Sequence, residues 1–187
     1  MAQTTYTLLQ FGSDPFNNRY EDQEGRPAFT LYASQAPNLV IRLSRESNWA
    51  QQIAYVMGPD NSYFYFGPGN TAGYIMYGNN HITLPMSHLS RQQREGSTSR
   101  YFTAQSGRHY KWRITPQRME VRCICCKGHD GLTLCMDGRN CICVWEVISS
   151  PENEYDARVT FKPAALALVT EIMTTLILNR MYLALGW

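Results

Sequence analysis

The chain has 187 residues, of which 17% are charged and 12% aromatic, and its formal net charge is +2. This length fits one domain with a single core, and the composition excludes an intrinsically disordered chain. The charge is unevenly distributed, because the stretch from Arg91 to Lys127 holds nine basic and two acidic residues, a local charge of +7 against −5 elsewhere. The middle third is therefore a candidate positive surface.

The N-terminal residues 1–23 contain no basic segment followed by an apolar one, so no secretory signal is predicted. We therefore expect a cytoplasmic protein, able to associate peripherally with a membrane. Cysteines in that compartment stay reduced by default, and structural disulfides are rare there.

Short runs rich in β-branched and aromatic residues predict strands, and residues that favour turns separate them. In chain order the runs cover residues 6–11, 28–34, 39–44, 52–57, 62–67, 73–78, 81–85, 100–104, 108–114, 118–126, 132–136, 141–148 and 157–163. No helix is predicted between them, which excludes an alternating βαβ fold. The pattern favours one domain over residues 1–187, mainly β, built as a closed or nearly closed antiparallel barrel of about twelve strands.

The segment from Pro163 to Leu185 is the only long apolar stretch, and Pro163 suits the first turn of a helix. Glu171, Asn179 and Arg180 interrupt it, which argues against a membrane span. Apolar residues cover nearly its whole circumference, as in a helix buried on every side. We expect this helix to be threaded through the barrel as its core, which disfavours an internal cavity for a small apolar ligand.

Three segments carry a resemblance to a known family: residues 14–34 (DPFNNRYEDQEGRPAFTLYAS), 106–114 (SGRHYKWRI) and 159–183 (VTFKPAALALVTEIMTTLILNRMYL). They resemble a family of fungal, largely mushroom, proteins of unknown function in the tubby C-terminal-like group. The resemblance implies a barrel of about twelve strands around a central C-terminal helix. Relatives of that fold include tubby, which binds phosphoinositide head groups, the phospholipid scramblases, and plant proteins linked to defence. The fold does not carry one function, and no lipid ligand of tubby matches a position in this chain.

Alternation along residues 108–114 and 118–126 sorts the basic side chains onto one face of the predicted sheet. The predicted outer face carries His109, Lys111, Arg113, Arg118 and Arg122. Such a face suits anionic phospholipid, a phosphoinositide or a protein partner. A solvated face whose charges keep strand edges from aggregating is the alternative. Tyr110 and Trp112 are predicted to point inward, so nucleic acid is not an expected partner.

All six cysteines lie between residues 123 and 143. Antiparallel pairing would place Cys123 near Cys143 and Cys125 near Cys141 on the core face, where reduced thiols behave as small hydrophobic groups. The alternative is a zinc-binding or thiol-redox hairpin that uses Cys123, Cys125, Cys126, Cys135, Cys141 and Cys143, with His129 nearby. The usual two-residue spacer between zinc ligands is absent. Disulfides are the third interpretation.

Catalytic patterns are weak, because the histidines at positions 81, 88, 109 and 129 are scattered and form no metal or triad signature. The sequence therefore favours a non-catalytic binding module without a cofactor over an enzyme.

Overall fold

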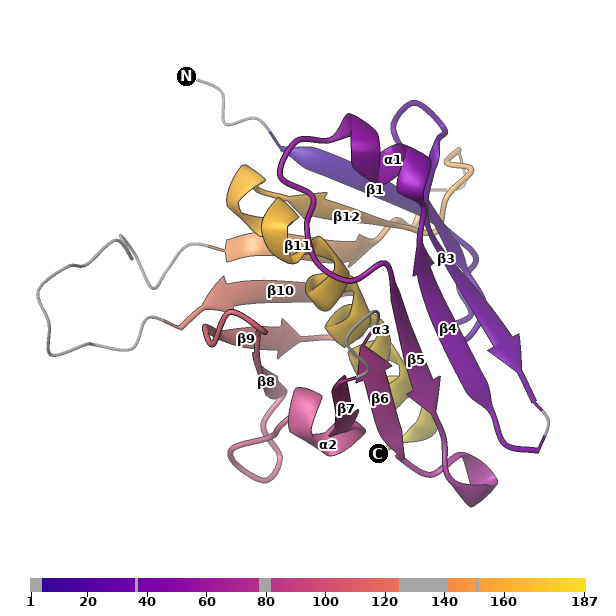
Figure 1. The fold of residues 1–187 in the computed structure, drawn as a ribbon, viewed down its shortest axis with the longest axis vertical. Helices are drawn as coiled ribbons and strands as arrows, with labels where there is room; N and C mark the ends of the chain where they lie inside the picture. Colours follow the sequence, from indigo (N-terminus) through magenta and orange to yellow (C-terminus); the bar gives the residue numbers. More distant parts are fainter. Residues whose placement is uncertain (1–4, 36, 78–81, 125–140, 151) are drawn as a thin grey trace, which may run out of the picture.

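The computed structural model describes residues 5–35, 37–77, 82–124, 141–150 and 152–187, and it shows a single antiparallel sheet around a helix (Figure 1). The strands are β1 (Tyr6–Phe11), β2 (Arg19–Asp22), β3 (Pro27–Ser34), β4 (Val40–Arg45), β5 (Asn61–Tyr65), β6 (Tyr74–Tyr77), β7 (Ile82–Pro85), β8 (Ser99–Thr103), β9 (His109–Ile114), β10 (Arg118–Cys123), β11 (Cys141–Val147) and β12 (Ala157–Phe161). The helices are α1 (Ser47–Gln52), η1 (Pro68–Asn70), α2 (Met86–Leu89), η2 (Pro163–Leu168) and α3 (Val169–Leu185). A mainly β fold of twelve antiparallel strands with a buried C-terminal helix is thus confirmed.

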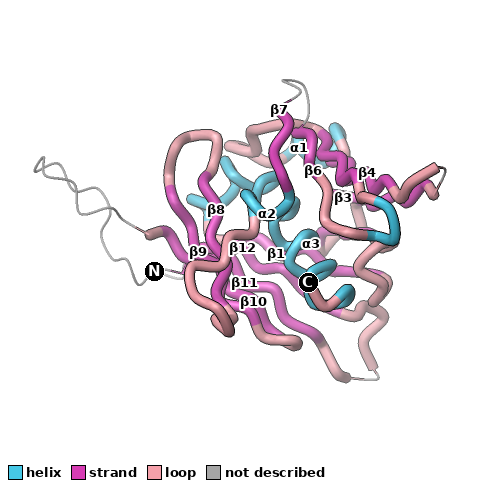
Figure 2. The backbone as a smooth tube through the Cα atoms, turned by 90° about the horizontal axis from the view of Figure 1, so that it is seen from below, coloured by secondary structure: helices cyan, strands magenta, loops and turns pink. Residues whose placement is uncertain are grey.

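The sheet is an up-and-down meander whose spatial order is β7-β6-β5-β4-β3-β2-β1-β12-β11-β10-β9-β8. Strands that follow each other in the sequence pair with one another, except β7 and β8, and β1 pairs with β12 across the two ends of the chain. Figure 2 shows how the sheet curls around α3, with α2 near the gap between its two edges. The sheet is therefore open: the predicted closed or nearly closed barrel is wrong in that β7 and β8 do not pair to close it.

The residues at the end of β7 favour the gap between β7 and β8. Pro85 ends β7 and has no N–H to donate to a neighbouring strand, which suits an edge position. The chain then turns into α2, which contacts both β7 and β8 and whose Met86 and Leu89 are buried. The free edge of β8 is covered in part by Arg91, which exchanges two backbone hydrogen bonds of 2.8 and 3.0 Å with Tyr101.

The sequence-based assignment of strands differs from the structure at two places, and a third predicted strand cannot be compared. Residues 52–57 do not form a strand: Tyr55 has φ of 73° and is 75% exposed, and the preceding α1 is anchored instead by Trp49, packed 5.5 Å from the ring of Phe29. Strand β2 was not predicted, because the charged residues of RYED hide an alternation that buries Tyr20 and Asp22. The predicted strand 132–136 lies outside the described residues.

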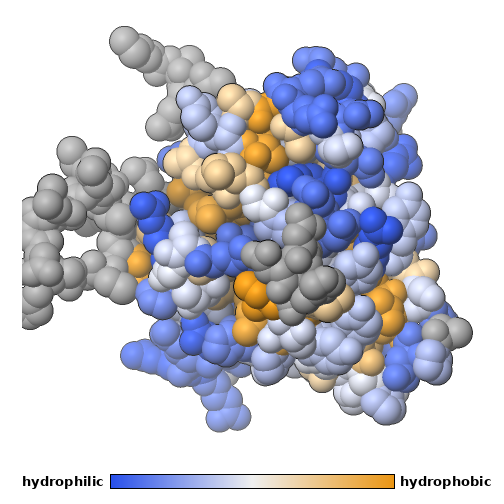
Figure 3. Space-filling model, viewed as in Figure 1, coloured by the Kyte–Doolittle hydropathy of each residue, from blue (hydrophilic) through white to orange (hydrophobic). Residues whose placement is uncertain are grey.

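The C-terminal helix forms the core. The segment Pro163–Leu185 is long and apolar enough to cross a membrane, but 83% of its most apolar part is buried inside the fold. Gly186, at φ 69°, adopts the left-handed conformation that ends the helix. In the view of Figure 3, apolar side chains reach the surface in several separate places, including the upper centre, below the centre and the right side, while the lower left is hydrophilic.

Polar side chains of α3 are buried, and they find partners on the surrounding strands. Thr175 accepts a hydrogen bond of 2.9 Å from the Nε1–H of Trp112, and Thr174 lies 2.9 Å from the hydroxyl of Ser62. Asn179 accepts one of 2.6 Å from Ser90. These bonds fix the rotation and depth of the helix inside the sheet, which an all-apolar helix would leave poorly defined.

Glu171 of α3 gives the fold a specific pH dependence. Burial raises the pKa of its carboxyl, and the N–H of Gln105, 2.8 Å away, opposes this only in part. Because the pKa of Glu171 is higher in the folded than in the unfolded chain, its protonated carboxyl contributes to the stability of the fold. This contribution is fully present below the unfolded pKa and is lost as pH rises through the folded pKa. We expect Glu171→Gln to be more stable than wild type at neutral pH, and this advantage to vanish near pH ~4 in urea titrations. An advantage that grows as pH falls would contradict this account.

Candidate functional site

The predicted basic residues lie on the outer face of β9 and β10, while Tyr110, Trp112 and Ile114 are buried beneath them. In the antiparallel register, Arg113 is opposite Glu120 and Lys111 is opposite Arg122. The outer face of β9–β12 carries five cations against two glutamates: Lys111, Arg113, Arg118, Arg122 and Arg158, with Glu120 and Glu146. The structure thus places the five predicted basic residues, His109, Lys111, Arg113, Arg118 and Arg122, on two neighbouring strands.

The carboxylates are not shared equally among these cations. Arg118 lies between Glu120 and Glu146, at 2.9 and 2.5 Å, and Glu146 also holds Arg158 at 2.5 Å. Arg122 pairs with Glu120 at 3.0 Å, and these two arginines together lower the pKa of the Glu120 carboxyl. Arg118 and Arg122 are therefore largely neutralised by neighbours. Alternation along β11 is enough to place Glu146 on this face. Its partners Arg118 and Arg158 lie on the strands to either side, so the pairing depends on the strand order.

The cations of β9 lack this compensation. The side chain of Arg113 is exposed and forms no ion pair within the part of the chain that the structure describes. Lys111 places its Nζ 5.6 Å from the ring centroid of Tyr101 on β8, a cation–π contact that leaves the positive charge in place. His109 lies 2.9 Å from the hydroxyl of Thr103, which also accepts a hydrogen bond from Arg91. Uncompensated positive charge therefore gathers toward the β8 edge.

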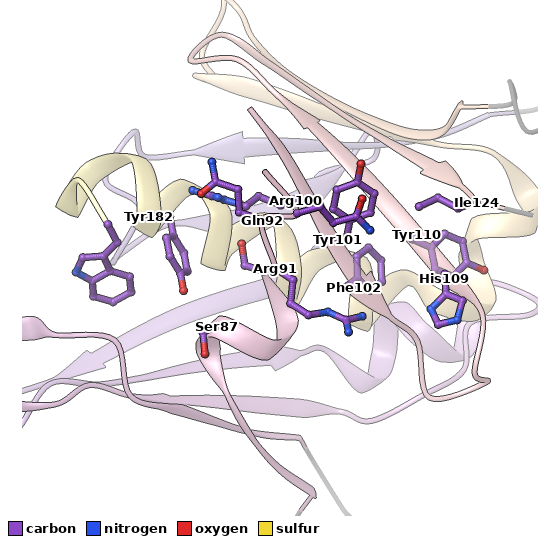
Figure 4. A pocket seen from close by; sticks show the side chains of 13 residues that line it. Ser87, Arg91, Gln92, Arg100, Tyr101, Phe102, His109, Tyr110, Ile124 and Tyr182 are labelled. Atoms are coloured by element: carbon purple, nitrogen blue, oxygen red, sulfur yellow. The ribbon is translucent and has the colours of Figure 1, made fainter. Parts of the chain in front are cut away.

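A cavity of about 750 Å³ adjoins this edge at the seam between α2 and β8 (Figure 4). Its lining includes the basic side chains of Arg91, Arg100 and His109, and no aspartate or glutamate side chain is among the described residues that line it. Arg100 points to the inner side of the sheet, 5.4 Å from the ring centroid of Tyr182 on α3. We name Arg91, Arg100, His109, Lys111 and Arg113 the basic margin. Arg91 and Arg100 were not predicted as site residues, because their position beside α2 and α3 depends on how distant segments pack together.

The described cysteines do not converge as the sequence suggested. Cys143 is opposite Val121, and a bulge next to this pair places Cys141 opposite Arg122, so the predicted pairing of Cys123 with Cys143 is wrong. Cys123 is instead opposite Tyr110 of β9. Within the described residues, no group of three or more His, Cys, Asp or Glu side chains is placed to hold a metal ion.

Three of the proposed zinc ligands, Cys125, Cys126 and Cys135, together with His129, lie outside the described residues. The zinc or thiol-redox hairpin stays a prediction for this reason.

Thiol reactivity should differ between the two cysteines of β11. Cys143 is 1% exposed, and burial raises the pKa of its thiol well above the usual range. Cys141 is only partly buried; burial, aided by Glu120, raises its pKa to a lesser degree. Since the thiolate is the reactive form, we expect iodoacetamide at pH ~8 to alkylate Cys141 slowly and Cys143 only after unfolding, as read by peptide mass spectrometry. Equal labelling rates in the native protein would contradict the buried position of Cys143.

The fold and this margin define a class: a twelve-stranded antiparallel sheet wrapped around its C-terminal helix, with a cationic margin beside the open seam. Searches of protein-family models, curated proteins and solved structures found no match to this chain.

Proposed function

We propose that this protein is a non-catalytic binding module that docks onto anionic phospholipid, including phosphoinositide, through its basic margin. The observation that carries this proposal is the contrast within one face: Arg118 and Arg122 are paired with glutamates, whereas Lys111 and Arg113 are not. Each lysine or arginine near a negatively charged membrane surface contributes about 1 kcal/mol to binding. The margin therefore holds the charge that such a surface would attract.

The proposal extends to the class of fold and to the cellular compartment. A sheet of twelve strands that curls around a C-terminal helix supports a relationship to the tubby C-terminal-like group, in the fungal branch that residues 14–34, 106–114 and 159–183 resemble. The module would then act in the cytoplasm, at the inner surface of a membrane.

Vesicle sedimentation tests the proposal. The full chain is mixed with phosphatidylcholine vesicles, alone or with added phosphatidylserine or phosphoinositide. We expect binding only to the anionic vesicles, and loss of that binding when ionic strength rises from about 0.1 M to about 1 M, which shortens the Debye length from about 10 Å to about 3 Å. No binding at the lower ionic strength would overturn the lipid proposal and favour a protein partner for the same margin.

A further inference from the structure

Arg180, near the C-terminal end of α3, is a buried cation without a carboxylate partner among the described residues. It is 8% exposed. Its Nη2 donates a hydrogen bond of 2.9 Å to the carbonyl of Ser13, and its Nη1 a long one of 3.4 Å to the hydroxyl of Tyr20. The guanidinium carbon also lies 5.3 Å from the ring centroid of Trp145. All these partners are neutral, so no carboxylate of the described residues lies within ion-pair distance of the guanidinium.

A buried guanidinium stays charged, and burying a charge is costly unless a counter-charge accompanies it. Arg45 of the same chain shows the usual solution. The side chain of Arg45 is 8% exposed, and a carboxylate oxygen of Asp60 lies 2.5 Å from its Nη2. The contrast marks Arg180 as a position where an anion is missing.

Arg180 lines a cavity of about 400 Å³ whose other walls are mostly apolar, including Met119, Trp145 and Leu183. Leu183 and Val147, which also lines the cavity, are 50% and 40% exposed, so large apolar groups stand uncovered around a buried cation. One carboxylate lines the cavity, that of Asp156, and it accepts a hydrogen bond of 2.8 Å from the N–H of Gly12. The volume lies within the range of small-molecule sites.

We propose that this cavity binds a small organic monoanion with an apolar body, such as a medium-chain carboxylate. The carboxylate would pair with the guanidinium of Arg180, and the chain would lie against Met119, Val147 and Leu183. A single guanidinium, with Nη1 and Nη2 already donating, suits one negative charge better than a phosphate dianion.

The site differs from the one proposed for membrane binding. Arg180, Leu183 and Ala184 share one face of α3, at i, i+3 and i+4, and line this cavity, while Tyr182 lines the seam cavity. Failure of one proposal therefore leaves the other standing.

Calorimetric titration of the full chain with octanoate tests the site, with 1-octanol as the neutral ligand of matched length. We expect octanoate to bind at least about tenfold more tightly than octanol, the effect of one charged hydrogen bond. Arg180→Met should abolish this preference. Absence of octanoate binding, or an unchanged preference for octanoate over octanol in Arg180→Met, would overturn the proposal. The role of Arg180 would then be structural, through its hydrogen bond to the carbonyl of Ser13.

A second variant keeps the test decisive if Arg180→Met fails to fold. Ala184 is exposed and lines the cavity, so Ala184→Trp fills it while Arg180 stays in place. Ala164→Trp is the matched control, at an exposed alanine near the other end of the C-terminal helical segment. We expect Ala184→Trp to lose octanoate binding and Ala164→Trp to retain it. Binding that survives in Ala184→Trp would place octanoate elsewhere and overturn the proposal.

Discussion

Replacing Trp112 with alanine should lower the free energy of unfolding by about 3–5 kcal/mol, the range measured for large-to-small changes of buried aromatic residues. Trp112 is fully buried on the inner face of β9. It also donates the hydrogen bond of 2.9 Å that ties the sheet to Thr175 of α3. The substitution thus removes packing and a polar link between the two parts of the fold. Urea denaturation followed by circular dichroism measures the loss, which is a large fraction of typical domain stability.

Tyr32→Ala is the control for this substitution, because Tyr32 also lies on a strand but is 60% exposed. We expect it to change stability by no more than about 0.5 kcal/mol. Trp112→Phe separates the two contributions, since it keeps most of the apolar volume and loses only the donor to Thr175. A loss below about 1 kcal/mol in Trp112→Ala would mean that β9 does not pack on α3 as described.

Patterns confined to one element were predicted correctly from the sequence. Alternation along β9 placed Trp112 inside and Lys111 outside, because side chains of a strand point to opposite faces regardless of its neighbours. The apolar circumference of 163–185 predicted a buried helix for a similar reason. Both inferences needed only the periodicity of a single segment.

Features that depend on two segments were not accessible in this way. The bulge beside Val121 shifts the register of β11 by one residue, and that shift separates Cys141 from the core face that holds Cys143. The open seam depends on the positions of β7 and β8 relative to each other in the folded chain. Only Pro85, at the end of β7, indicates an edge strand in the sequence.

Arg180 shows how context changes the meaning of a residue. In the sequence it served only as an argument against a membrane span. In the fold, Arg180 is buried and lines a cavity beside the C-terminal end of α3, because the sheet leaves space on that side of the helix. Cavities of about 750 and 400 Å³, both open to the surface, are lined in part by residues at the C-terminal end of α3.

The double substitution Lys111→Glu and Arg113→Glu should weaken binding to phosphoinositide-containing vesicles by at least about thirtyfold, the equivalent of losing two cations at about 1 kcal/mol each. The reversed charges add repulsion, so thirtyfold is a lower estimate. Neither residue holds a carboxylate in the described part of the chain, and both side chains lie on the outer face of β9, so the fold should not change. Vesicle sedimentation gives the affinity, and circular dichroism checks the fold.

The control of equal charge reverses two arginines on the other half of the sheet, Arg19→Glu on β2 and Arg42→Glu on β4. Both are exposed, and the pair changes the net charge by the same amount as the substitutions on β9. Arg19 pairs with Glu21 at 2.7 Å, so circular dichroism checks the fold of the control as well. If the basic margin docks on the membrane, the control should lose much less affinity, because charges beyond a Debye length of about 8 Å from the lipid are screened at physiological salt. An equal loss in both variants would show that net charge alone drives binding, and the basic margin would no longer be the docking site.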